Sequence, residues 1–187
     1  MAFQECRRAW AKSGENYSYS ELTQMASRAE PFKSIVDPDA PDFLHPEDMP
    51  SAVRAYCQRT GQAVPETKPA ILRCIFESLA VKYRYVYKRL EKLIGYTFDV
   101  VHIIGGGSQN EFLNQLTADA LNIPVTAGPV EATALGNAMM QAVTLKYYKN
   151  IFEARQALSA QMELKEFHPI SSDGWEEIYH RFLKLVD

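Results

Sequence analysis

The pattern of hydrophobic and polar positions predicts a chain built mostly of helices. The longest pattern runs from Lys68 to Ile94, with Thr67 as a candidate N-cap and Gly95 after the last turn. Its apolar residues recur at helical spacing and are Ile71, Ile75, Leu79, Tyr83, Val86, Leu90 and Ile94. Further apolar residues widen this stripe, so we expect the helix to be buried along a broad face.

Shorter helices are expected on either side. They cover residues 4–12, a segment capped by Ser18 or Ser20 that ends at Ala29, and residues 50–60, 151–159 and 174–186. The first of them has no N-cap before it, which predicts a chain cut from something longer, the alternative being a frayed N-terminus. Residues 31–50 are rich in proline and predict an irregular loop with apolar residues that still need burial.

In the middle of the chain, strands alternate with helices. The pattern predicts a strand over Asp99–Ile104, a helix over Ser108–Leu121, a second strand over Ile123–Ala127 and a helix from Val130 to about Tyr147. Ser108 and Glu111 have the spacing of a capping box at the start of the first of these helices. Two successive strand–helix units predict a helix-rich α/β fold with a short parallel sheet.

Composition excludes several classes of protein. The 187 residues fit a single domain, and the net charge of -3 comes from acidic and basic residues mixed along the chain, unlike the basic face of a nucleic-acid-binding protein. No apolar run approaches the roughly 20 residues of a membrane span, and the N-terminus has no apolar signal region. The three cysteines and four histidines show no metal-ligand spacing. We therefore expect a cytoplasmic protein with reduced thiols, no metal site, and no nucleic-acid or membrane partner.

Gly105, Gly106 and Gly107 stand between the first predicted strand and its helix. Without Cβ atoms, this backbone can approach a ligand closely, and free N–H groups at a helix start attract anions. The segment from Ile104 to Asn110 is therefore a candidate site for a phosphate or a ribose phosphate. A tight turn that only needs a flexible backbone is the alternative, and the glycines alone leave both open.

Two familiar phosphate-binding motifs are excluded. A P-loop needs a lysine after its last glycine, and no Lys or Arg occurs between Lys92 and Lys146. A dinucleotide fingerprint needs a third glycine where Asn110 stands and an acidic residue at the end of the next strand, where Ala127 is followed by Gly128. An NAD-dependent enzyme is thus disfavoured. The charge of a bound nucleotide would have to be offset by backbone N–H groups, by Mg²⁺ or by residues outside this chain.

The helix after the second strand carries small residues on one face. Ala132 and Gly136 would let it pack closely against the glycine turn or against a flat adenine ring. Tight helix packing without a ligand explains the same residues. Glu131, in the predicted first turn, favours the helix dipole and need not be catalytic.

Several segments of the sequence resemble a known protein family. Residues 102–110, 113–119 and 127–137 closely resemble the FGGY carbohydrate kinases, as do residues 36–49 and 64–80. The likeness covers nearly the whole chain. Many sugar kinases share the glycine run, whereas the run from Ala127 to Asn137 points more narrowly to the branch of the family that phosphorylates L-rhamnulose.

The resemblance implies a ribonuclease H-like, actin-like ATPase fold of two domains. Residues 1–187 would be a single C-terminal domain that lacks its first strands and the whole N-terminal domain. ATP with Mg²⁺ would phosphorylate the 1-hydroxyl of L-rhamnulose. The turn at Gly105–Gly107 and Asn110 would face the adenosine side, with Gly106 the best single candidate, and Gln4 matches a glutamine that lies near the nucleotide in the family.

The same resemblance implies that this chain alone is inactive. The phosphate-binding hairpin, most of the sugar pocket and the aspartate base would lie outside it, and it would not bind Mg²⁺ by itself. Asp99, Asp119 and Glu131 are available carboxylates, but nothing in their spacing makes one a base, so no catalytic residue is nominated. A kinase for another ketose or polyol and a non-catalytic interaction module are the alternatives.

The absent strands have a structural consequence. If they normally pair with Asp99–Ile104, this strand has an open, apolar edge, which invites pairing with another chain. We expect self-association through that strand, or its coverage by a rearranged segment.

Overall fold

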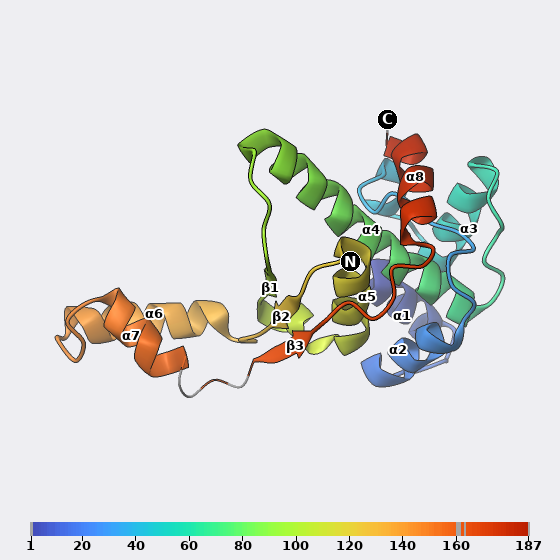
Figure 1. The fold of residues 1–187 in the computed structure, drawn as a ribbon. Coiled ribbons are helices and arrows are strands. Elements are labelled where there is room, and N and C mark those ends of the chain that lie inside the picture. The colour runs from blue at the N-terminus through green and yellow to red at the C-terminus, as the bar shows by residue number, and fades with distance from the viewer. Residues whose placement is uncertain (1, 160–161, 163, 187) are drawn as a thin grey trace.

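The computed structural model describes residues 2–159, 162 and 164–186 and shows helices arranged around a small sheet (Figure 1). The helices are α1 (Ala2–Lys12), α2 (Tyr19–Arg28), α3 (Met49–Arg59), α4 (Lys68–Ile94), α5 (Glu111–Leu121), α6 (Ala132–Thr144), α7 (Ile151–Ser159) and α8 (Trp175–Val186). Two short 3-10 helices are η1 (Pro41–Phe43) and η2 (Gly105–Gln109). The strands are β1 (Val101–Ile103), β2 (Val125–Ala127) and β3 (Lys165–Phe167).

Local end signals fix several helix boundaries where the sequence places them. At the start of α4, the Thr67 hydroxyl accepts a hydrogen bond from the Ala70 N–H at 3.3 Å, and at its end Gly95 adopts the left-handed conformation. Ser18, one of the two predicted caps, begins α2 through a capping box with Glu21. The predicted bounds of α4 and α7 are confirmed.

The sheet is mixed, with strand order β1–β2–β3. β1 and β2 are parallel, in the register Val101 to Val125, and are joined through α5, so the predicted parallel unit is confirmed. β3 runs antiparallel to β2, with Phe167 opposite Val125, and was not predicted. Its sequence, Lys-Glu-Phe, lacks the apolar run of a buried strand, and its antiparallel pairing makes the three-stranded sheet mixed.

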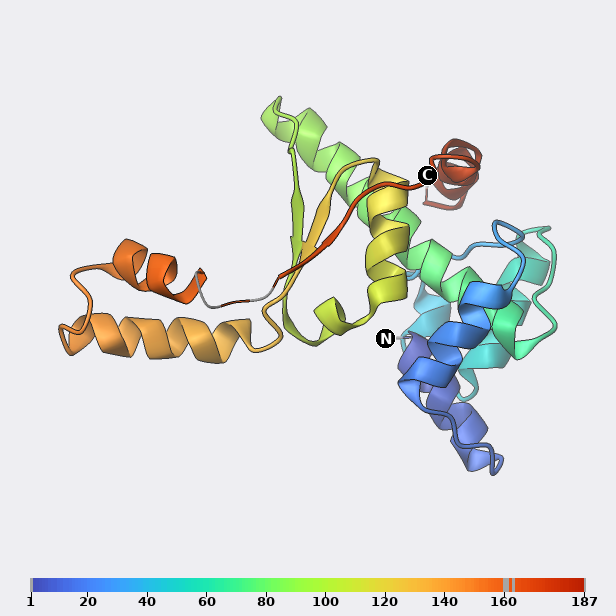
Figure 2. The same cartoon turned by 60° about the horizontal axis from the view of Figure 1, so that its bottom comes forward.

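The first half of α4 is the centre of the hydrophobic core. Helices α1, α2, α3 and α8 pack around it, while α5 packs against α4 on one side and against β2 and β3 on the other. Helices α6 and α7 pack against each other and extend away from this body, as both views show (Figures 1 and 2). In the described ranges, no helix combines the length and apolarity needed to cross a bilayer.

The second half of α4 departs from the prediction. Tyr83 is 37% exposed and Leu93 is 80% exposed, and Val86, Leu90 and Ile94 are exposed as well. The broad buried face therefore covers only the first part of the helix, from Ile71 to Val81 and again at Tyr87. Hydrophobic periodicity shows which face of a helix is apolar, but it does not show what covers that face.

The C-terminal helix is attached to the loop after α2. The Arg181 guanidinium donates to the carbonyl oxygens of Phe32 and Lys33 at 2.7 and 3.0 Å. The Phe32 ring packs edge-on against Trp175, at 5.1 Å between ring centroids. Phe32 has a positive φ of 61°, an uncommon conformation for a bulky residue, and its N–H donates to the buried carboxylate of Glu77.

A substitution at Gly174 would test how closely α8 packs against the loop after α2. We expect Gly174→Ala to lower the free energy of unfolding by about 3 kcal/mol, because the new Cβ would combine left-handed strain with a clash. That Cβ would lie 2.7 Å from the Phe32 ring, and φ at Gly174 is +79°. Gly61→Ala is the matched control, since φ is +67° there and no atom lies within 4 Å. Urea denaturation measures the free energy of unfolding of both variants. Equal losses in the two variants would contradict close packing of Gly174 against Phe32.

Candidate functional site

The turn at the end of β1 contains one glycine that the backbone requires. Gly105 has a φ of +76°, and its N–H donates to the carbonyl oxygen of Pro129 at 2.9 Å. This N–H is therefore already bonded. The expectation of free N–H groups along the turn does not hold at Gly105.

Gly106 and Gly107 are different. Neither has a positive φ, and a Cβ added at either would meet no atom within 4 Å. Both are exposed. Neither the backbone conformation nor packing among the described residues explains why these two positions lack side chains.

The helix after the turn begins at a different cap from the predicted one. The Asn110 side-chain oxygen accepts from the Leu113 N–H at 3.1 Å, so Asn110 is the N-cap of α5. Ser108 lies within η2, and its hydroxyl donates to the Gly105 carbonyl instead. The predicted Ser108–Glu111 capping box was wrong, because the intervening 3-10 turn moves the helix start. The Asn110 amide nitrogen remains available to a ligand.

Four of the five predicted site residues line one open hollow. Gln4 of α1, Gly106 and Gly107 of the turn, and Asn110 border a space of about 860 Å³, while Gly105 is not among the lining residues. Gln4 lies about a hundred positions before the turn in the sequence, yet the fold brings them to one place. Helix α2 completes the wall with residues that were not predicted, namely Tyr19, Ser20, Thr23, Gln24 and Ser27.

The hollow has aromatic groups in its walls. Phe3, Tyr19 and Phe112 contribute to its lining. Beneath them, Phe76 of α4 packs against Phe3 at 4.9 Å and against Phe112 at 5.5 Å between ring centroids. This apolar surface could lie against the face of a flat ring.

Most of the other lining side chains are polar, and almost none is charged. The groups from α2, Gln4, Gln109 and Asn110 are hydroxyls and amides, and Glu111 is the single charged side chain among the described lining residues. Glu111 is exposed and pairs with Lys165. Two arginines beside the lining are also engaged: Arg7 stacks on the Tyr19 ring at 4.5 Å and donates to the Tyr17 carbonyl, and Arg73 lies over the Phe112 ring at 5.3 Å and pairs with Glu77. This arrangement suits a neutral, hydrogen-bonding ring and sugar, and offers little to compensate phosphate charge.

Helix α6 does not form part of the hollow. None of its residues is buried, and no atom lies within 4 Å of a Cβ added at Gly136. Figure 2 shows α6 beside α7, away from the turn. The expectation that its small face packs against the glycine turn was therefore wrong. The small residues Ala132 and Gly136 have no structural explanation within the described part of the chain.

The three available carboxylates do not form a catalytic group. Asp119 accepts hydrogen bonds from the Gln115 amide at 3.0 Å and the Ile170 N–H at 2.8 Å, which ties the segment after β3 to α5. Asp99 and Glu131 are exposed and far apart in the chain. Across the described ranges, no cluster of three or more His, Cys, Asp or Glu residues could hold a metal ion.

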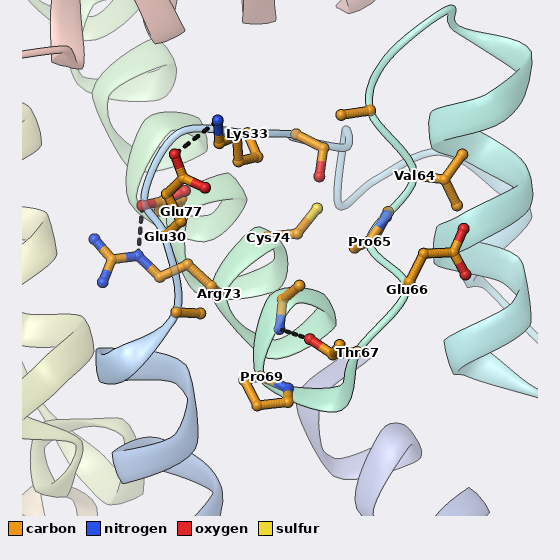
Figure 3. A pocket seen from close by; sticks show the side chains of 14 residues that line it. Glu30, Lys33, Val64, Pro65, Glu66, Thr67, Pro69, Arg73, Cys74 and Glu77 are labelled. Atoms are coloured by element: carbon orange, nitrogen blue, oxygen red, sulfur yellow. Dashed lines mark hydrogen bonds and ion pairs between the residues drawn. The ribbon is translucent and has the colours of Figure 1, made fainter.

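A second hollow of about 390 Å³ lies beside the first half of α4 (Figure 3). Four of its charged groups form two pairs, Lys33 with Glu30 and Arg73 with the buried Glu77, and Glu66 also lines it. Burial raises the pKa of the Glu77 carboxyl, while the Arg73 guanidinium opposes this shift. None of the predicted site residues lies here, whereas four of them line the first hollow, so the first hollow is the better candidate site.

Comparison with known proteins identifies the class of protein to which this fold belongs. Residues 1–145 match the C-terminal domain of the FGGY family of carbohydrate kinases, and the chain belongs to this family. Among curated relatives, it is 45% identical over 183 residues to rhamnulokinase from Bacteroides thetaiotaomicron, covering 98% of this chain and 37% of that protein. It is 40% identical over 158 residues to rhamnulokinase from Bacillus subtilis, covering 84% of this chain and 33% of that protein. The chain thus spans about a third of the length of these relatives.

Solved structures agree on the fold. A glycerol kinase from Plasmodium falciparum, determined with ADP, aligns with a TM-score of 0.64 at 18% identity over 90% of this chain and 33% of that one. A xylulose kinase from Lactobacillus acidophilus aligns with a TM-score of 0.65 at 16% identity over 98% of this chain and 36% of that one. The predicted actin-like ATPase architecture is confirmed at the level of the fold.

The glycine turn makes a prediction about stability that needs no ligand. Gly105→Ala should lower the free energy of unfolding by about 1 to 2 kcal/mol, because alanine is strained at a φ of +76°. Gly106→Ala and Gly107→Ala should change it by less than about 0.5 kcal/mol, because these positions are open and have ordinary φ angles. Urea denaturation of the three variants measures the difference. Equal losses would mean that all three glycines serve the turn itself.

Proposed function

We propose that this chain is the nucleotide-binding, C-terminal domain of an ATP-dependent sugar kinase and that the hollow holds the adenosine part of ATP. The observation that carries the proposal is the pair Gly106 and Gly107, which line the hollow and whose missing side chains have no explanation among the described residues. The adenine ring would lie against the aromatic lining, and the amides of Gln4 and Asn110 would bond to the base or the ribose.

The phosphates need a partner that this hollow does not supply. With Glu111 as its one charged lining residue, the hollow favours the neutral end of the nucleotide, so the phosphates would extend away from it. Mg²⁺ would accompany them and offset part of their charge, as it does in phosphoryl transfer generally. We propose that this chain alone neither holds the metal ion nor completes the reaction, and that the phosphate-binding and catalytic groups belong to the rest of a longer, two-domain enzyme.

The sugar proposed is L-rhamnulose, phosphorylated at its 1-hydroxyl in the cytoplasm as part of L-rhamnose breakdown. The support for this choice is the identity of 45% and 40% to two rhamnulokinases. A kinase of the same family that acts on another ketose or polyol is the second candidate. Most of the sugar pocket would lie outside this chain.

Binding of ADP to the chain tests the nucleotide proposal. We expect ADP with Mg²⁺ to bind with saturable heat in isothermal titration calorimetry, and Gly106→Ala to weaken the affinity about tenfold, since a methyl group there would occupy the ligand's surface. Gly136→Ala is the matched control, because that glycine is also open but lies on α6. Absence of binding by the unaltered chain at millimolar ADP would favour a non-catalytic interaction module that uses the turn only structurally.

We also propose that the chain self-associates through β1. β1 is an edge strand of the sheet within the described residues, and Val100 and Ile104 on either side of it are 38% and 60% exposed. The N–H of Val101 and the carbonyl of Ile103 bond to residues directly before and after β2. Because backbone groups alternate in direction along a strand, those of His102 face the open edge. A second copy could pair there by adding a strand.

A proline at the edge tests this pairing. We expect the unaltered chain to be dimeric in light scattering, and His102→Pro to shift it to monomer, because proline removes the outward N–H and leaves the bonds of Val101 and Ile103 to the β2 side intact. His102→Ala keeps that N–H and should remain dimeric. A monomeric unaltered chain would contradict the proposal.

A further inference from the structure

One fully buried polar side chain lies directly beneath the glycine turn. Asn114 of α5 is 0% exposed, and its amide nitrogen donates to the Ser108 carbonyl at 2.9 Å. Its amide oxygen is also buried and has no hydrogen-bond partner among the described residues. The only bond made by this side chain is therefore to the backbone of the turn.

Ser108 holds the other end of the same turn. It is buried, and its hydroxyl donates to the Gly105 carbonyl at 2.7 Å. Together these two bonds hold carbonyl groups at both ends of η2 from the inside, while Gly106 and Gly107 face the hollow. A run of glycines is conformationally permissive, so it needs such bonds to keep a single arrangement.

The energetics indicate that Asn114 is not there for packing. A buried amide oxygen without a partner costs about 1 to 3 kcal/mol, and an apolar residue at this position would avoid that cost. Most buried positions of the same helix are apolar, among them Leu113, Leu116 and Ala120, and the buried hydroxyl of Thr117 bonds within α5. What the asparagine adds is a directed bond to one carbonyl of the turn.

We infer that Asn114 is a positioning residue that holds the glycine turn in the form that accepts a nucleotide. This inference rests on the proposed function, and it assigns the role to a residue that touches the turn from behind and does not line the hollow. Loss of the bond would let the turn sample other conformations, and the ligand would then have to order it on binding.

The test compares Asn114→Leu with Thr117→Val in the full chain. Leucine has the same branching as asparagine but cannot donate, and Asn114→Ala serves as a second variant should leucine be too large. Thr117 is equally buried on the same helix, but its hydroxyl bonds only to the Leu113 carbonyl within α5. We expect both Asn114 variants to weaken ADP binding about tenfold by calorimetry, and Thr117→Val to stay within about twofold, whatever their melting temperatures.

Hydrogen exchange of the turn separates this inference from the proposed function. Without nucleotide, the amides of residues 105–110 should exchange several-fold faster in both Asn114 variants than in Thr117→Val. If the unaltered chain binds no ADP, the proposed function fails, and this exchange measurement alone decides the role of Asn114. If the unaltered chain binds ADP, an unchanged affinity in the Asn114 variants would overturn the inference. If the unaltered chain does not bind ADP, an unchanged rate of amide exchange in these variants would overturn it.

Discussion

The site depends on one aromatic contact in the core. Phe76 of α4 packs against Phe3 of α1 on one side and Phe112 of α5 on the other. Phe3 precedes Gln4, and Phe112 follows the glycine turn closely, so this ring fixes the spacing between two parts of the site that are far apart in sequence. Packing of these rings helps to hold α5 in place behind Gly106 and Gly107.

How much of this could be read from the sequence depends on how local each signal is. Thr67 and Gly95 place the ends of α4 correctly because caps act within one turn of a helix. β3 could not be found, since Lys-Glu-Phe has no apolar run and pairs with β2 only through the tertiary fold. The second half of α4 was predicted to be buried for a similar reason. Its apolar stripe has helical spacing, but whether that stripe is covered depends on which other elements pack against it.

The candidate site divides in the same way. The glycine turn is visible in sequence because its composition is unusual, and Gln4 was found only through a family resemblance. The α2 wall was missed because Ser20, Thr23 and Gln24 resemble the solvated face of any surface helix. No spacing rule connects them to residues near position 106, and the sequence carries no other signal that could have revealed them.

The charge of the lining residues bears on which part of the proposed function this hollow could carry out. Phosphoryl transfer depends on positive groups and metal ions placed around the transferred phosphate. The hollow instead offers aromatic rings, amides and hydroxyls, and the nearby Arg7 is engaged with Tyr19 and Tyr17. Such a surface fits the proposed role of holding a base and a ribose, and its described lining residues include no basic side chain for the charge that develops in transfer. Under the proposed function, this hollow would hold the base and ribose of the nucleotide, and groups outside it would act on the phosphates.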